Sequence, residues 1–288
     1  MLDERFLTRL ETLRLRMRDP AAGGAGGLRR SKALGTSVEF SDFREYATGD
    51  DLRRVDWNAY ARFDRLFVKL FMEEQEARVH LVLDASGSMA FGEPGKWDTA
   101  VKLAEILAYL ALCGGDTVSV IALQGEKAAS TRPLSGRQGY VEVAEFLQKI
   151  RPEGKTDLTA AAAAAALQSG RGICVFISDF LSPSGYETAL QSMQYRKQEV
   201  TALQILSRQE LEPELEGAVQ LLDAETGEAL EFMAGYDALQ GYRKVLTEFL
   251  TGLRHFCHQK AMAFSTFSAE ADIEQAFLRE LSRIGLLG

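Results

Sequence analysis

Three oxygen-bearing side chains stand at alternate positions directly after an apolar run. The segment Val79–Met89 reads V-H-L-V-L-D-A-S-G-S-M, so the run ends on Asp84, and Ser86 and Ser88 follow it. A continuous apolar run bounded by turn residues is typical of a buried parallel strand. The C-terminal end of such a strand faces the crevice where open α/β sheets bind ligands. One carboxylate and two hydroxyls make an oxygen-only site, which suits Mg²⁺ or Mn²⁺.

A second apolar run ends in the same way. Residues 173–178 predict a strand, and Asp179 stands at its C-terminal end. Between the two strands, Thr156 and Asp157 precede an alanine-rich run, where Thr and Asp commonly cap a helix. Capping alone explains this pair, but a threonine loop between two strands that end in Asp also predicts a constellation at one edge of the sheet.

Two resemblances rest on these residues and on the stretch before them. The D-x-S-x-S pattern after a strand resembles the metal-ion-dependent adhesion site of von Willebrand factor type A domains. The stretch V-E-F-S-D-F-R-E-Y-A-T-G-D-D-L-R-R-V-D-W (residues 38–57), followed by Ala61-Arg62, resembles the bacterial family called "domain of unknown function 58". Together the two resemblances cover most of residues 28–180.

The resemblance implies a fold and a site. The fold is α/β and von Willebrand factor A-like (Rossmann-like), a doubly wound, mostly parallel sheet flanked by helices, with an N-terminal helix and a β-hairpin-type excursion. The site holds Mg²⁺ or Mn²⁺ on the hydroxyls of Ser86 and Ser88, with Asp84, Thr156 and Asp179 contributing directly or through water. An exchangeable position is left for a partner's carboxylate. The implied partner is a MoxR-type AAA+ ATPase, which a protein of this kind serves as an adaptor or co-chaperone.

The remaining pattern predicts three parts. Residues 1–27 hold an amphipathic helix over 2–18 and a glycine-rich linker over 20–27. Residues 28–77 form a charged segment packed on the body. Residues 78–288 form the A-like domain, in which strands and helices alternate, residues 218–232 predict a β-hairpin, and residues 236–258 and 272–284 predict helices.

The charged segment admits two interpretations. Ten basic and ten acidic side chains are interleaved over residues 28–78, with short strands expected near 38–40 and 66–71 and with Trp57 and Tyr60 as possible anchors to the body. One interpretation is a purely structural excursion on the domain, held together by arginine–carboxylate ion pairs. The other is a docking surface whose charges select a partner. The candidate partner-binding residues are Arg44, Asp50, Asp51, Arg53, Asp56 and Trp57.

The composition argues against several functional classes of protein. The chain has 288 residues and a net charge of −8, which argues against nucleic-acid and anionic-membrane binding. Three scattered cysteines without a C-x-x-C pattern indicate reduced thiols in a cytoplasm. No apolar run reaches the length of a membrane span, and the opening M-L-D-E-R is not typical of a signal peptide.

Catalytic alternatives are less well supported by the sequence. Gly154-Lys155-Thr156 resembles the end of a phosphate-binding loop, but Lys149 stands where its first glycine belongs. An aspartyl phosphatase needs a second Asp where Ser86 stands. A metal-dependent hydrolase needs a general base, for which Asp157 or Asp98 is the candidate. We therefore expect a non-enzymatic binding module; a hydrolase, or a scaffold with a vestigial site, is the alternative.

Overall fold

The chain divides into two units, which are described separately. The computed structural model describes residues 4–16, 39–48, 50–72, 77–124, 127–155, 158–159, 172–215, 217–225 and 227–287. One unit comprises Arg29–Glu76, and the other comprises Met1–Leu28 with Ala77–Gly288. The expected linker over residues 20–27, Thr156 and Asp157 lie outside the described residues. The packing of residues 28–77 on the body stays a prediction.

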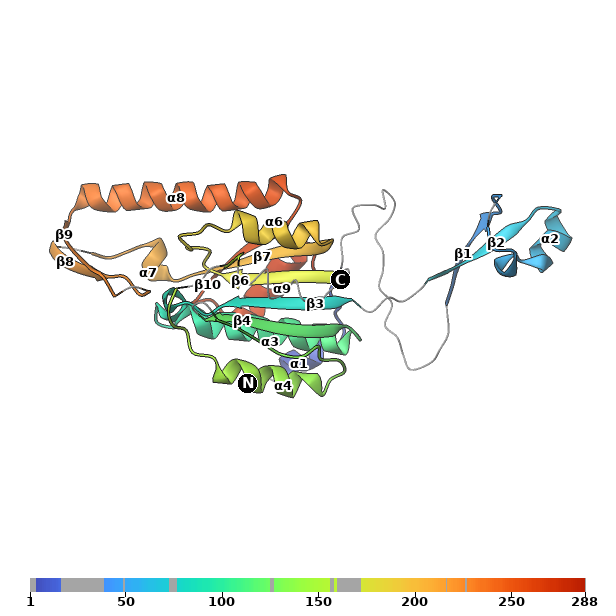
Figure 1. Cartoon of the computed structure of the whole chain (residues 1–288), viewed down its shortest axis with the longest axis horizontal. Coiled ribbons are helices and arrows are strands. Elements are labelled where there is room, and N and C mark those ends of the chain that lie inside the picture. The colour runs from blue at the N-terminus through green and yellow to red at the C-terminus, as the bar shows by residue number, and fades with distance from the viewer. Residues whose placement is uncertain are drawn as a thin grey trace. The chain divides into compact units, whose positions relative to one another are not determined.

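The larger unit is built on a six-stranded sheet (Figure 1). Its strand order is β10-β7-β6-β3-β4-β5, and every neighbouring pair is parallel except β4 and β5. The strands are β3 (Arg78–Asp84), β4 (Thr117–Gln124), β5 (Lys127–Ser130), β6 (Gly172–Ser178), β7 (Gln198–Leu206) and β10 (Ala263–Ser268). The apolar runs of β3 and β6 are buried on both faces, as parallel strands under helices require. The predicted doubly wound, mostly parallel α/β fold is confirmed.

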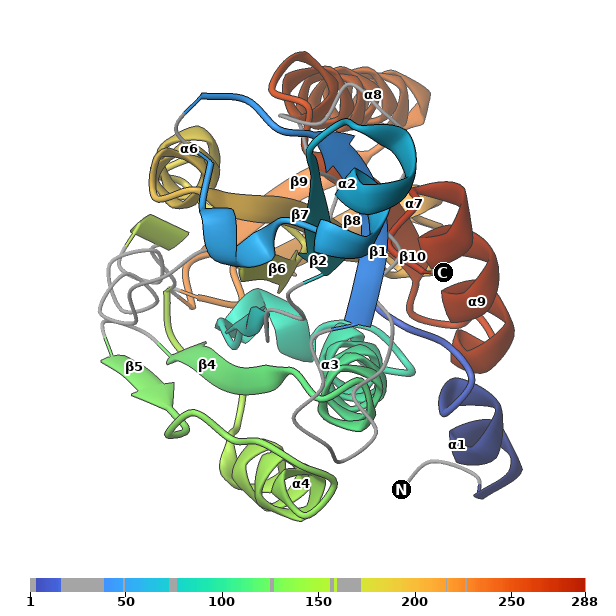
Figure 2. The same cartoon turned by 90° about the vertical axis from the view of Figure 1, so that its right-hand side faces the viewer.

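Helices cover both faces of this sheet (Figure 2). The helices α3 (Lys96–Cys113), α4 (Gly139–Lys149) and α9 (Ile273–Arg283) pack into one apolar cluster, and α6 (Glu187–Tyr195) and α8 (Tyr236–Gln259) pack into another on the opposite face. Alternate residues of β3 divide between the two clusters, with Leu81 in the first and Val82 in the second. Within the described ranges, no helix is both long and apolar enough to span a membrane.

The N-terminal helix is shorter than its apolar pattern predicts. Helix α1 runs only from Glu4 to Leu10, whereas the pattern predicts a helix over residues 2–18. Residues 11–16, which follow it, are not helical, and the Arg14 guanidinium donates hydrogen bonds to the main-chain oxygens of Glu11 and Leu13 in this segment. The helix belongs to the larger unit, because Phe6 is buried against the ring of Phe277.

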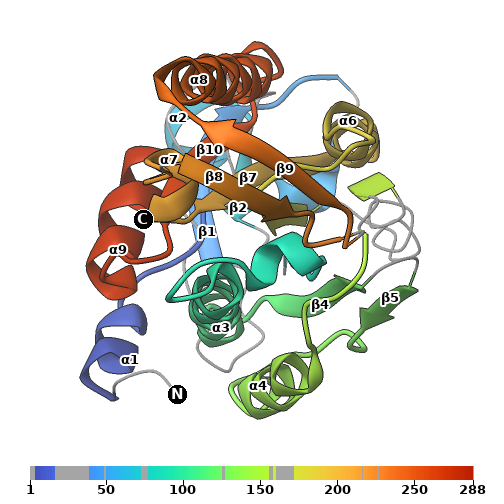
Figure 3. The same cartoon turned by 90° about the vertical axis from the view of Figure 1, so that its left-hand side faces the viewer.

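A two-stranded hairpin lies at the carboxyl end of the main sheet. It pairs β8 (Gly217–Leu222) with β9 (Ala229–Ala234), as the sequence predicts, and leads directly into α8. Figure 3 shows this hairpin crossing in front of the sheet at the end where β3 stops. Short helix α7 (Arg208–Leu211) connects β7 to it.

The smaller unit contains its own antiparallel pair. Strands β1 (Glu39–Glu45) and β2 (Phe67–Met72) pair over their length, so the expected strands are present. A 3₁₀ turn over Leu52–Arg54 and helix α2 (Trp57–Phe63) stand between the two strands. Buried Val55 and Val68 pair across a bridge, which holds this connection on β2.

Candidate functional site

Asp84 is the buried starting point of the candidate site. It is the last residue of β3, and only 3% of its surface is exposed. The amide of Ser86 donates to its Oδ1 at 3.0 Å, and the hydroxyl of Ser178 donates to its Oδ2 at 2.6 Å. Ser178 ends β6, which pairs with β3, so the sheet itself orients the Asp84 carboxylate.

A chain of oxygens leads from this loop to the second strand. The hydroxyl oxygens of Ser86 and Ser88 lie 3.0 Å apart, and the Ser88 hydroxyl donates to Oδ2 of Asp179 at 2.8 Å. Asp179 is 1% exposed, and its Oδ1 accepts the amide of Leu181 at 2.9 Å. The structure therefore brings together four of the five predicted metal ligands.

The fifth predicted ligand cannot be placed. Thr156 lies outside the described residues, as does Asp157, one of the two candidate general bases. Asp98, the other candidate, is exposed in the first turn of α3.

A buried lysine at this site was not predicted. Lys96 begins α3 with a side chain that is fully buried, and its Nζ lies 2.6 Å from Oδ2 of Asp179 and 2.5 Å from Oε1 of Glu210. Burial lowers the pKa of Lys96, but the carboxylates of Asp179 and Glu210 together raise it above its ordinary value. The side chain is therefore an ammonium ion at neutral pH, and it forms a fixed cation beside the candidate metal ligands.

Glu210 is held in place by a capping box. Ser207 follows β7, its Oγ accepts the amide of Glu210, and the Glu210 Oε2 accepts the amide of Ser207 at 2.8 Å. This reciprocal pair leaves Oε1 of Glu210 directed at Lys96. The S-R-Q-E sequence signals the helix start, but nothing in it indicates the ion pair.

The hairpin turn lies directly over the serine loop. A Cβ placed on Gly87 would be 2.3 Å from the main-chain oxygen of Ala224, so glycine is required for this approach. The neighbouring Glu225 has a raised pKa, chiefly because of burial and then because of the carboxylates of Asp84 and Asp179. The turn therefore carries a further carboxylate to the edge of the site.

The electrostatics of Asp84 favour a cation nearby. Burial and the Asp179 carboxylate raise the pKa of Asp84, and they outweigh the hydrogen bonds from Ser178 and Ser86 that lower it. Charge on this carboxylate is therefore costly unless a positive group neutralises it. Lys96 contacts Asp179 and Glu210, and no contact between Lys96 and Asp84 is formed within the hydrogen-bond range.

The donor set fits a hard divalent ion. Carboxylate and hydroxyl oxygens, supplied by Asp84, Ser86, Ser88 and Asp179, are the ligand types that Mg²⁺ and Mn²⁺ accept. In the part of the chain that the structure describes, no group of three or more His, Cys, Asp or Glu side chains could hold a metal. Serine hydroxyls and water would complete the ligand set of an ion held by the Asp84 and Asp179 carboxylates.

The candidate partner-binding residues of the smaller unit divide into two kinds. Four of the six have local structural roles: Arg44 and Asp50 form an ion pair at 2.8 Å, and Asp51 and Asp56 accept main-chain amides at the starts of the 3₁₀ turn and of α2. The amide of Ala47 and the Arg44 guanidinium lower the pKa of Asp50.

The other two candidates project from this unit. Arg53 is exposed, and Trp57 is 59% exposed. Asp51 and Arg44 are exposed as well, so only Asp56 among the six candidates is buried.

The mostly parallel sheet, with the serine loop at its carboxyl end, has the α/β fold that the resemblance to von Willebrand factor type A domains implies. The chain belongs to the family described as "Protein of unknown function DUF58", which it matches over residues 42–246. Its relatives include the uncharacterized proteins Mb1516 of Mycobacterium bovis and Rv1480 of Mycobacterium tuberculosis. Each is 30% identical over 236 residues, which is 80% of this chain and 74% of the relative.

Solved structures with a similar arrangement include two of low sequence identity. BatB from Bacteroides thetaiotaomicron is 16% identical with a TM-score of 0.47, over 73% of this chain and 98% of that one. The SpRpn10 VWA domain is 8% identical with a TM-score of 0.41, over 71% and 94%.

Proposed function

We propose that this protein is a non-enzymatic, metal-dependent protein-binding module. The observation that supports it is the convergence of Asp84, Ser86, Ser88 and Asp179 at the carboxyl end of two neighbouring strands. These residues would hold Mg²⁺ or Mn²⁺, directly or through water, and the ion would accept a carboxylate of the partner. When bound, the ion supplies the positive charge that attracts this carboxylate.

The chain's own residues prepare the site for this role. Ser178 and the Ser86 amide orient the Asp84 carboxylate, and Ser88 connects the loop to Asp179. Lys96 neutralises part of the charge on Asp179 from the buried side, so Asp84 and the serine hydroxyls supply most of the attraction for the ion. This balance favours a weakly held ion that a partner completes.

We further propose a MoxR-type AAA+ ATPase as the partner and the cytoplasm as the compartment. The family to which the chain belongs supports the partner, because the resemblance that identifies this family implies an adaptor or co-chaperone of such ATPases. The described free cysteines, of which Cys174 and Cys257 are buried, support a reducing compartment.

Calorimetric titration with Mg²⁺ and Mn²⁺ measures the site directly. The wild type is expected to bind one ion, and Asp84→Asn is expected to bind none. Asp98→Asn, which removes an exposed carboxylate from the first turn of α3, is the matched control. Binding of an immobilised MoxR-type ATPase from the same organism is then compared with and without EDTA.

The two measurements separate the parts of the proposal. Ion binding that persists in Asp84→Asn would overturn the metal site. ATPase binding that EDTA leaves unchanged would show that the ion is not the contact, and it would favour a scaffold with a vestigial site. In that case Trp57→Ser and Arg53→Ser address the smaller unit as the docking surface.

A further inference from the structure

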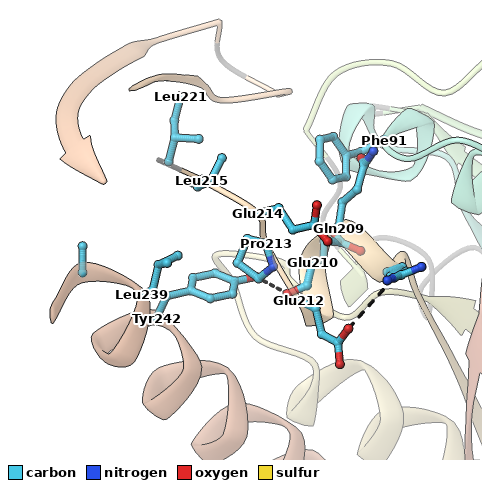
Figure 4. A pocket seen from close by; sticks show the side chains of 12 residues that line it. Phe91, Gln209, Glu210, Glu212, Pro213, Glu214, Leu215, Leu221, Leu239 and Tyr242 are labelled. Carbon is cyan, nitrogen blue, oxygen red and sulfur yellow. Dashed lines mark hydrogen bonds and ion pairs between the residues drawn. The ribbon is translucent and has the colours of Figure 1, made fainter. Parts of the chain in front are cut away.

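A cavity of about 680 Å³ is lined in part by α7, whose Glu210 pairs with Lys96 at the candidate metal site. Its walls come from the loop after α7, from strand β8 of the hairpin and from the first turns of α8 (Figure 4). The apolar lining consists mainly of Phe91, Pro213, Leu215, Leu221 and Leu239. The cavity is therefore an apolar surface that the described part of the larger unit leaves open.

The apolar surface extends beyond the cavity. Leu221 on β8 and Leu230 on β9 are directly opposite in register and share a face, and their side chains are 44% and 64% exposed. The first half of α8 contributes Leu239 and Tyr242 to the cavity, and Tyr242 is 41% exposed. Exposed apolar side chains that adjoin an apolar cavity form a larger apolar area than single surface residues do, and such areas mark contacts with other molecules.

The charges around the cavity are negative on balance. Glu212 and Glu214 line it with one arginine, Arg208, whose Nε is 3.9 Å from Glu212, whereas Glu210 is already paired with Lys96. The hydroxyl of Tyr242 donates to the main-chain oxygen of Glu210 at 2.7 Å, which ties α8 to α7 at the base of the cavity. The acidic lining attracts cations and disfavours phosphate-bearing ligands, because like charges facing each other oppose binding.

We propose that this cavity binds a segment of a partner protein in which an apolar side chain is flanked by lysine or arginine. The apolar side chain enters between Leu221 and Leu239, and the basic residues face Glu212 and Glu214. The acidic lining selects such a segment over an anionic lipid surface or a nucleic acid. This contact is separate from the ion at Asp84 and does not depend on it.

Three pools of fluorescent twelve-residue peptides test this proposal. One pool has Leu, Phe or Met at the centre with Lys or Arg on both sides. The second has the same centre with Asp or Glu on both sides, and the third keeps the basic flanks around Ser or Asn. Fluorescence anisotropy with the full chain at physiological salt is expected to show binding of the first pool alone.

Four variants locate the binding. Leu239→Asp is expected to weaken binding of the first pool about tenfold, because the substitution places a charge in the apolar wall of the cavity. The double reversal Glu212→Lys with Glu214→Lys is expected to weaken it roughly three- to tenfold, and more at low salt. Glu248→Lys, an exposed reversal further along α8, and Asp84→Asn are expected to leave it unchanged, and thermal melting confirms that each variant is folded.

Several outcomes overturn the proposal. Equal binding of the basic and acidic pools removes the role of the glutamates. Undiminished binding to both cavity variants places the contact elsewhere. Binding to anionic vesicles of phosphatidylglycerol, with none to peptides, identifies a membrane surface instead. If Asp84→Asn no longer binds the first pool, the peptide contact depends on the metal site, and the proposed independence of the two sites is wrong.

Discussion

The ammonium of Lys96 lies 2.6 Å from the carboxylate of Asp179, and both side chains are buried. A lysine at the start of a helix is normally solvated, because burial of a charge is costly without a partner. Here Asp179 and Glu210 are both partners. Asp179 directly follows β6, and Glu210 lies in α7, which follows β7. The ion pairs therefore fasten α3 to the edge of the sheet at the site where a ligand is expected.

Lys96→Met is expected to destabilise the fold by about 3 to 5 kcal/mol, because it leaves two carboxylates without their buried cation. Chemical denaturation in EDTA measures the loss. Lys102→Met on the same helix removes an exposed lysine and is expected to change stability by less than about 0.5 kcal/mol. Equal effects of the two substitutions would contradict a structural role for the buried ion pairs.

Asp84→Asn is expected to stabilise the metal-free protein at neutral pH. The pKa of Asp84 is raised above its ordinary value of 3.8, so the folded state binds a proton more tightly than the unfolded state. Stability from this group is present at low pH and lost as pH rises through the folded pKa. Asparagine removes the penalised charge and keeps an acceptor for the Ser86 amide, while its NH2 group donates to the Ser178 hydroxyl, which must turn to accept.

Melting temperatures of the wild type and of Asp84→Asn, each in EDTA and in excess Mg²⁺, test this expectation. In EDTA the variant is expected to melt above the wild type. Added Mg²⁺ is expected to raise the melting temperature of the wild type alone. The corresponding gain in its free energy of unfolding is about 2.7 kcal/mol at a hundredfold excess of Mg²⁺ over Kd. A variant that melts below the wild type in EDTA would assign Asp84 a purely structural role.

Gly87→Ala is expected to displace the hairpin turn. The new Cβ would meet the main-chain oxygen of Ala224 at 2.3 Å, and overpacking of this kind costs about 1 to 3 kcal/mol. Limited proteolysis is expected to cut the variant faster at residues 223–227. Gly241→Ala in α8, where the added Cβ would contact nothing outside its own helix backbone within 4 Å, is expected to leave the cleavage rate unchanged. Unchanged cleavage in Gly87→Ala would show that the turn does not rest on the loop.

His80 is expected to make stability fall in mild acid. Its ring is 1% exposed, and neither ring nitrogen has a hydrogen-bond partner among the described residues. Burial, and then Arg78, lower its pKa below the ordinary 6.5, so the unfolded state binds the proton first. Stability is full above pH 6.5 and is lost as pH falls below it.

Chemical denaturation at a series of pH values from about 5 to 8, which brackets the ordinary histidine pKa, measures how the free energy of unfolding changes with pH. His80→Leu is expected to flatten this dependence. His255→Gln, which replaces an exposed histidine of α8, is expected to retain it. Identical slopes in the wild type and His80→Leu would assign the acid sensitivity to other groups.

The sequence by itself determined the main sheet, and with it the approach of Asp84 to Asp179. Apolar runs of strand length, separated by helical patterns, form parallel strands, and parallel strands end at one edge. Two carboxylates that follow such runs therefore meet there. Local rules also predicted the hairpin at residues 218–232 and helix α8, because turn and periodicity signals lie within the segments themselves.

Tertiary structure alone decided the surroundings of these carboxylates. Lys96 is 83 residues from Asp179 and 114 from Glu210, so no local pattern indicates that the three meet. The approach of Ala224 to Gly87 depends likewise on where the hairpin folds back. The bridge between Leu15 and Leu287 joins two segments that lie even farther apart in the sequence. Such contacts arise from packing between distant segments, and only the folded chain brings those segments together.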